Sequence, residues 1–154
     1  MNIIMNKAIE SAIKGIRNKE GGPFGAVITD KDGNIIASGN NKVIINNDPT
    51  AHAEVIAIRN ACQILKTYDL SNYIMYTTCE PCPMCLGAII WSNIKTVYYG
   101  CDKEDANNIG FRDDIIYEYI KGNNKDLISL HKLDEETAKE AFDSFKNSLD
   151  KEIY

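Results

Sequence analysis

Basic residues are in the minority in this chain, and they form no block. The sequence holds 17 Lys and Arg against 22 Asp and Glu, which gives a formal net charge of −5 at pH 7. The cations are scattered, so no segment is suited to neutralising a row of phosphates. This balance argues against a nucleic-acid partner and favours a small-molecule one.

Long apolar runs are also missing. The longest, residues 86–94, is far shorter than the roughly 20 residues that span a membrane. At the N-terminus, Lys7 and Glu10 interrupt the apolar residues before a signal-peptide core can form. We therefore expect no membrane association and a cytoplasmic location.

Proline and glycine are too thinly spread to mark a linker, and no repeat or low-complexity segment is present. The 154 residues are enough for one domain with its own core, so we expect a single domain over residues 1–154. Within it, residues 134–154 resemble an added C-terminal helix and tail.

Apolar periodicity, turn residues and β-favouring runs predict alternating helices and strands. Strand–helix alternation in the middle of the chain indicates an α/β fold with helices on both faces of the sheet. Helices are predicted over residues 3–16, 48–65 (opened by Asp48-Pro49), 82–92, 114–120 and 134–149, and strands over 24–29, 34–38, 73–77, 96–99 and 127–130.

Five cysteines are present, an odd number, and three of them fall within seven residues. In a chain without a secretion signal, this spacing fits metal binding better than disulfides. Cys62 and Cys101 are expected to be packing residues. His131, the only histidine besides His52, is expected at the surface or a strand end.

The strongest pattern joins His52 and Glu54 to the pair Cys82 and Cys85. A Cys-x-x-Cys pair places two thiolates about one helical turn apart, and an imidazole adds a third ligand. This donor set favours zinc, and three protein ligands leave a fourth position open for catalysis. We predict one Zn2+ per subunit, bound by His52, Cys82 and Cys85.

His52 and Glu54 are two residues apart, so they cannot share one side of a helix. They converge on one ion only if the ion lies in front of the helix start, where Asp48-Pro49 places them. Cys82 also opens a predicted helix. Two positive helix ends would then face the ion and stabilise the thiolates.

An open position on zinc supplies hydroxide at neutral pH, because the ion lowers the pKa of a bound water. Glu54 would take the proton from this water and return it to the substrate and the leaving ammonia. His-x-Glu followed by Pro-Cys-x-x-Cys is typical of zinc-dependent deaminases. We predict hydrolytic deamination with Glu54 as the catalytic acid and base.

Other interpretations of these cysteines remain. The pair could be redox-active, or the zinc could be structural with Glu54 or Cys79 as its fourth ligand. Cys79 and Cys82 form a second, overlapping Cys-x-x-Cys. We prefer Cys82 and Cys85, because Cys79 precedes the predicted helix.

Around these residues the sequence resembles the cytidine and deoxycytidylate deaminase superfamily. Within it, the chain looks like the small bacterial guanine deaminases that use zinc. The matching runs are residues 21–27, 47–54, 78–89, 110–113 and 116–117, together with a C-terminal aromatic residue. The zinc motifs mark only the superfamily, whereas Gly-Phe-x-Asp at 110–113 and the terminal tyrosine point to guanine.

This resemblance implies a three-layer α/β/α fold with a five-stranded mixed sheet, and a homodimer whose C-terminal segment can be swapped between subunits. It also implies a purine base as substrate and conversion of guanine to xanthine, with hydroxide attacking C2. By position, Asn41 would hydrogen-bond the base and Phe24 would pack against it. Asp113 would read its polar edge, and Tyr154 would help to close the pocket. Arg112 departs from the acidic residue usual beside Asp113.

Three rival functions remain. The first is a tRNA adenosine deaminase, which shares the run at 47–54 but needs a basic groove for the anticodon stem. The second is a cytosine, cytidine or guanosine deaminase with the same zinc chemistry. The third is a zinc-stabilised interaction protein without catalysis, in which an unligated Glu54 beside the metal has no role.

Overall fold

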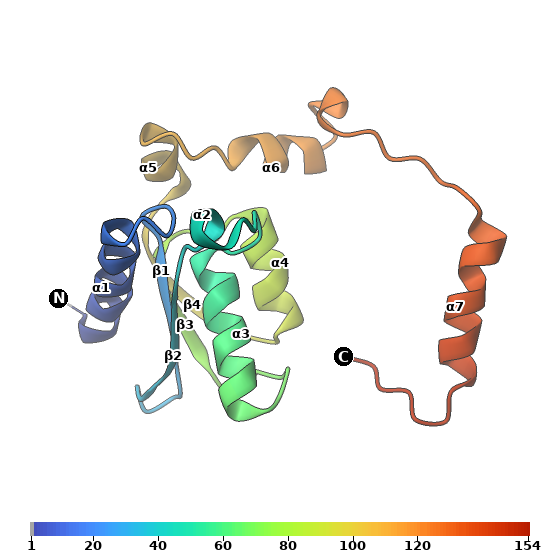
Figure 1. Cartoon of the computed structure of the whole chain (residues 1–154), viewed down its shortest axis with the longest axis horizontal. Coiled ribbons are helices and arrows are strands. Elements are labelled where there is room, and N and C mark those ends of the chain that lie inside the picture. Colours follow the sequence, from blue (N-terminus) through green and yellow to red (C-terminus); the bar gives the residue numbers. More distant parts are fainter. Residues whose placement is uncertain (1) are drawn as a thin grey trace. The chain divides into compact units, whose positions relative to one another are not determined.

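The computed structural model describes residues 2–154 (Figure 1). They form two compact units, one ending at Tyr117 and the other comprising Glu118–Tyr154. Among residues 2–154, no helix combines the length and the apolar character needed to cross a membrane. The elements in chain order are α1 Ile3–Arg17, β1 Gly25–Thr29, β2 Ile35–Asn40, α2 Val43–Asn46, α3 Ala53–Leu65, β3 Ile74–Cys79, α4 Pro83–Trp91, β4 Thr96–Cys101, α5 Lys103–Asn108, α6 Asp114–Ile120, η1 Lys125–Leu127 and α7 Glu135–Asn147.

A mixed four-stranded sheet in the order β2-β1-β3-β4 forms the centre of the N-terminal unit. β1 pairs antiparallel with both β2 and β3, whereas β3 and β4 run parallel. The β1–β2 turn is held by Asp30, whose Oδ1 accepts hydrogen bonds of 2.9 Å from the backbone N–H groups of Asp32 and Asn34. Gly33 supplies the positive φ of 85° that this turn requires.

Helices cover both faces of the sheet: α1 lies on one side, and α3 and α4 lie on the other (Figure 1). α3 packs closely because Ala53, Ala57 and Ala61 are fully buried at four-residue spacing. The approach is so tight that a Cβ at Gly39 would lie 2.6 Å from the Ala53 carbonyl oxygen. These small residues fix the α3 N-terminus at the end of the sheet where the candidate site lies.

The expected α/β fold with a mixed sheet and helices on both faces is confirmed, but the expected fifth strand is wrong. Instead of a strand over 127–130, the C-terminal unit has the single turn η1, and Leu127, Ile128 and Leu130 are at least half exposed. A strand needs a neighbouring strand to satisfy its backbone groups, and residues 127–130 pair with none of the four strands of the sheet. The other apolar side chains of this unit, in α7 and the tail, are exposed as well.

The predicted start of one helix also needs correction. α3 begins at Ala53 rather than at Asp48, because the Asp48 carboxylate accepts from the backbone N–H of Thr50 at 2.8 Å and forms a turn there. Farther along the chain, Asp102 caps α5 in a reciprocal capping box with Asp105.

Candidate functional site

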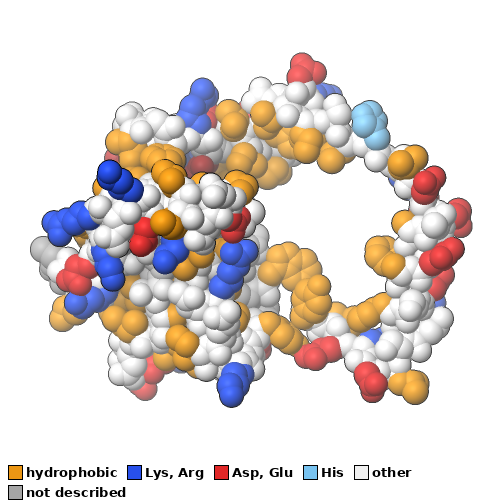
Figure 2. All heavy atoms as spheres, viewed as in Figure 1, with side chains coloured by type: hydrophobic (Ala, Val, Ile, Leu, Met, Phe, Trp, Pro, Cys, Tyr) orange, Lys and Arg blue, Asp and Glu red, His pale blue; other side chains and the backbone are white. Residues whose placement is uncertain are grey.

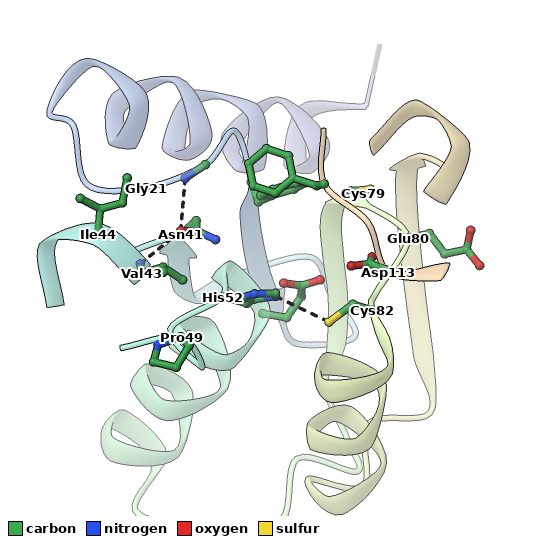
Figure 3. Close-up of a pocket in the computed structure, with 14 residues that line it drawn as sticks. Gly21, Asn41, Val43, Ile44, Pro49, His52, Cys79, Glu80, Cys82 and Asp113 are labelled. Atoms are coloured by element: carbon green, nitrogen blue, oxygen red, sulfur yellow. Dashed lines mark hydrogen bonds between the residues drawn. The ribbon is translucent and has the colours of Figure 1, made fainter. Parts of the chain in front are cut away.

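Three side chains with metal-binding atoms meet where α3 and α4 begin. His52 is the N-cap residue of α3, Cys82 is the N-cap of α4, and Cys85 lies in the first turn of α4. Their donor atoms all lie within 4.8 Å of one another. His52 Nδ1 is 3.6 Å from the Sγ of Cys82 (Figure 3). It is 3.5 Å from the Sγ of Cys85.

Negative charge is favoured at the centre of this cluster. The hydrogen bond from Cys85, followed by that from His52, lowers the pKa of Cys82 to about 4. The same interaction with Cys82 raises the pKa of Cys85, and that of His52 is raised as well. The partial positive charges of two helix N-termini also favour a thiolate over a thiol at this position. The cluster therefore provides one thiolate and two further metal-binding atoms that are directed at one point.

The donor chemistry fits zinc. One imidazole and two cysteine sulfurs are soft to intermediate ligands, which zinc prefers and magnesium or calcium do not. His52 and the two cysteines supply three ligands, one fewer than a closed structural zinc site requires.

Glu54 is the buried carboxylate of the site, with only 6% of its surface exposed. It occupies the first turn of α3, and its Oε2 accepts a hydrogen bond of 3.4 Å from the Cys85 thiol. Burial raises the pKa of Glu54, so the carboxylate accepts a proton more readily than an exposed glutamate does. Its position in the second residue of α3 gives a proton acceptor beside the three-ligand cluster.

Cys79 is close to the cluster but behaves differently. It ends β3, and its thiol donates to the Asp102 carbonyl oxygen at 3.5 Å. Burial raises its pKa to about 12, so this thiol stays neutral. The geometry thus groups Cys82 and Cys85 with His52 and leaves Cys79 outside. His131 belongs to the C-terminal unit.

A cavity of about 410 Å3 opens in front of the cluster. This volume lies within the range of small-molecule sites. Three of the residues that line the cavity, Phe24, Asn41 and Asp113, were expected from the sequence to contact the substrate. The lining residues are Gly21, Gly22, Phe24, Asn41, Val43, Ile44, Pro49, His52, Glu54, Cys79, Glu80, Cys82, Phe111 and Asp113.

Asn41 is buried, and its side chain is held in one orientation. Its Oδ1 accepts hydrogen bonds of 3.2 Å from the backbone N–H groups of Gly22 and Val43 (Figure 3). With the oxygen occupied by two backbone donors, the amide nitrogen is the part of the side chain left to contact a ligand. Gly21 makes this arrangement possible, because a Cβ there would lie 2.0 Å from Asn41 Oδ1.

Two aromatic rings form one wall of the cavity. Phe24 and Phe111 meet edge to face, with their centroids 4.9 Å apart and an interplanar angle of 83°. Phe24 was expected here, whereas no contact was predicted for Phe111 from the sequence. An aromatic residue two positions before Asp113 was the available signal. The pair provides an apolar surface suited to a flat ring.

Asp113 extends into the cavity toward His52 and Cys82, whereas the carboxylate of Glu80 is turned away (Figure 3). Burial raises the pKa of Asp113. Arg112 does not neutralise it, because the guanidinium pairs with Asp114 at 3.3 Å. Tyr154, the fourth expected substrate contact, lies in the C-terminal unit and is not among the described residues that line this cavity.

Comparison with known proteins gives a consistent assignment. The cytidine and deoxycytidylate deaminase zinc-binding region matches residues 2–101. A guanine deaminase of Bacillus subtilis is 54% identical over 116 residues, which cover 75% of this chain and 74% of that protein. A tRNA-specific adenosine deaminase of Haemophilus influenzae is 44% identical over 63% of this chain and 56% of its own length.

The fold agrees with these sequence matches. The X-ray structure of guanine deaminase from Bacillus subtilis covers 100% of this chain and 99% of its own, with a TM-score of 0.92 and 44% sequence identity. Both the family match and the identity extend over most of the N-terminal unit, including the cluster at the starts of α3 and α4. The chain therefore belongs to the cytidine and deoxycytidylate deaminase zinc-binding family.

Proposed function

We propose that this protein is a zinc-dependent guanine deaminase that hydrolyses guanine to xanthine and ammonia. The observation that carries the proposal is one cavity, lined by His52 and Cys82 of the metal cluster and by Glu54, together with Asn41, Phe24 and Asp113. The similarity to guanine deaminase over the full chain supports the choice of substrate.

For the hydrolysis, the protein must supply metal ligands and one proton acceptor. His52, Cys82 and Cys85 would hold the ion, which when bound supplies a water of lowered pKa. Glu54 accepts a proton from the attacking water at its carboxylate and delivers it to the ring nitrogen beside C2. A C–O bond forms at C2, and Glu54 then takes the second proton from the new C2 hydroxyl group and delivers it to the amino group. The C–N bond breaks, ammonia leaves, and C2 becomes a carbonyl carbon of xanthine.

Recognition of the base follows from complementary donors and acceptors. Guanine carries acceptors at O6 and its unprotonated ring nitrogens, and donors at N1 and the amino group. Asn41, whose oxygen is occupied, presents its amide donor, and Asp113 presents an acceptor. The Phe24 ring packs against the flat base, and it keeps the base in the plane that these polar groups address.

A phosphorylated or RNA substrate is a weaker candidate. Among the described residues that line the cavity, none is Lys or Arg, while Glu54, Glu80 and Asp113 are acidic. On the face visible in Figure 2, the Lys and Arg side chains of the N-terminal unit are scattered rather than gathered in a stripe. A tRNA anticodon stem needs such a stripe. The tRNA-specific adenosine deaminase similarity makes this the alternative to test.

A deamination panel tests the substrate assignment. The zinc-loaded protein would be incubated with guanine, guanosine, adenine, cytosine, cytidine and a tRNA anticodon stem containing adenosine, and ammonia release would be followed. We expect turnover of guanine. Turnover of tRNA or cytosine without guanine would overturn the substrate assignment and leave the zinc chemistry in place. No turnover of any substrate would favour the zinc-stabilised interaction protein.

We also propose a homodimer with one zinc per subunit, in which the C-terminal segment is swapped and Tyr154 helps to close the partner's pocket. The exposed apolar side chains of α7 and the tail support this, because they need a surface to cover them. Removing Tyr154 should raise the KM for guanine with zinc retained. An unchanged KM would leave the tail a packing element only. The cytoplasmic location stays a prediction.

A further inference from the structure

Tyr117 connects two parts of the site that are far apart in the sequence. Its hydroxyl donates a hydrogen bond of 3.4 Å to the carbonyl oxygen of Pro81, the residue before Cys82. The Lys103 ammonium lies 5.5 Å from the centre of the Tyr117 ring, on its face. Partial burial raises the pKa of Tyr117, so the hydroxyl stays protonated as a donor.

The segment that receives this hydrogen bond has few backbone donors. Pro81 and Pro83 flank Cys82, and neither has an N–H group. Its backbone is held on one side by Glu80, whose N–H donates to the Cys101 carbonyl oxygen at 2.8 Å. On the other side, the Cys82 carbonyl oxygen accepts from Leu86 at 2.8 Å as α4 begins. Between these points, the Tyr117 hydroxyl is the side-chain donor that holds the Pro81 peptide group.

The segment that carries Tyr117 also carries Asp113. Residues 110–117 follow α5 and enter α6, and contacts with other segments of the N-terminal unit hold them at two places. At one end, the Phe111 ring contacts Phe24 and the Phe111 N–H donates to the Ala106 carbonyl oxygen at 3.0 Å. At the other end, Tyr117 contacts Pro81. Asp113 lies between the two, one helical turn before Tyr117, and extends into the cavity.

We propose that Tyr117 is a positioning residue that ties the segment carrying Asp113 to the loop carrying Cys82 and so aims the Asp113 carboxylate at the substrate. This inference rests on the proposed function for the identity of the substrate. Tyr117 is absent from the cavity lining, and it acts through Asp113 rather than by touching the base. The expected defect is therefore in substrate binding, with the zinc ligands intact.

The first experiment is independent of turnover. Hydrogen–deuterium exchange would be compared between the zinc-loaded full-length protein and its Tyr117→Phe variant, which keeps the ring over Lys103 but loses the hydroxyl. Faster exchange is expected in residues 110–117, and the Cys82–Leu86 amides are the second region to follow. Tyr119→Phe, the same substitution two residues along α6, is the matched control. Unchanged exchange in residues 110–117 of Tyr117→Phe would overturn the proposal.

The second experiment measures guanine turnover by the same proteins. Loss of one hydrogen bond predicts a KM raised about three- to ten-fold in Tyr117→Phe, with kcat close to wild type and zinc content unchanged. In an Asp113→Asn background, the further substitution Tyr117→Phe should have little added effect. A lower melting temperature with an unchanged KM, or independent effects in the double variant, would reduce Tyr117 to a structural role. A wild-type protein inactive on guanine would instead refute the proposed function, and the exchange result would still decide the tie.

Discussion

Replacing Gly21 with alanine should damage substrate binding through a single steric conflict. The added Cβ would lie 2.0 Å from Asn41 Oδ1 and 2.6 Å from the Asn41 carbonyl oxygen. Neither oxygen can give way alone, because Oδ1 accepts from Gly22 and Val43 and the other atom belongs to the backbone. The Asn41 amide must therefore leave the orientation that presents its nitrogen to the cavity.

The magnitude follows from the contacts that are lost. Two buried hydrogen bonds to Asn41 contribute about 0.5–1.5 kcal/mol each, and overpacking of a tight site costs about 1–3 kcal/mol. We expect Gly21→Ala to lower the free energy of unfolding by about 3 kcal/mol, or the melting temperature by about 6–12 °C in a chain of this size. Loss of one substrate hydrogen bond adds a roughly ten-fold rise in the KM for guanine.

Thermal denaturation and xanthine formation, both measured on the zinc-loaded protein, would check this prediction. Gly87→Ala is the matched control, because a Cβ at Gly87 in α4 meets no atom within 4 Å. That substitution should stabilise the helix by up to about 1 kcal/mol and leave KM unchanged. If Gly21→Ala had the melting temperature and KM of the wild type, the steric argument for Asn41 would be refuted.

Three further predictions concern the catalytic carboxylate, the metal ligands and the pH dependence of stability. Glu54→Ala should retain zinc by metal analysis while kcat falls about 10²- to 10⁴-fold, and loss of zinc would make Glu54 a ligand. Cys85→Ser should lose zinc, whereas Cys79→Ser should keep it; the reverse result would move the ligand pair to Cys79 and Cys82. A hydrogen bond from Asn40 at 2.7 Å lowers the pKa of Glu20, so its stabilisation is present above the ordinary glutamate pKa and lost as the pH falls through the lowered value. Melting temperatures of wild type and Glu20→Gln should therefore differ at pH 7 and converge once the pH falls below the lowered pKa of Glu20; a gap independent of pH would contradict this assignment.

The metal cluster could be predicted from the sequence because its geometry is local. Cys82 and Cys85 are one helical turn apart, and His52 and Glu54 converge only in front of a helix start. The N-cap of α3 is His52, four residues beyond the predicted Asp48, and the argument survives because His52 still lies at the helix start. The position of a helix end depends on side-chain competition, here between helix initiation at Pro49 and the turn made by Asp48.

The cavity walls were predictable only through family resemblance. Asn41 follows β2, and Asp113 precedes α6, so their meeting depends on the sheet and on the path of residues 102–113. No sequence spacing encodes that path. The predicted fifth strand was wrong for a related reason. The apolar run over 127–130 satisfies a strand pattern, but a strand also needs a neighbouring strand to pair with, and the local sequence does not report whether one is in reach.

The position of the metal cluster at two helix starts separates the reaction from the choice of substrate. His52 and Glu54 are set by the start of α3, whose packing against the sheet tolerates little change, and Cys82 is set by the start of α4, which packs beside α3. The groups that face the base come from the segment before β1 and from the loops that follow β2 and α5. Substitutions in these loops could therefore redirect the same hydrolytic centre to another amino-bearing ring, and engineering of this scaffold should begin there.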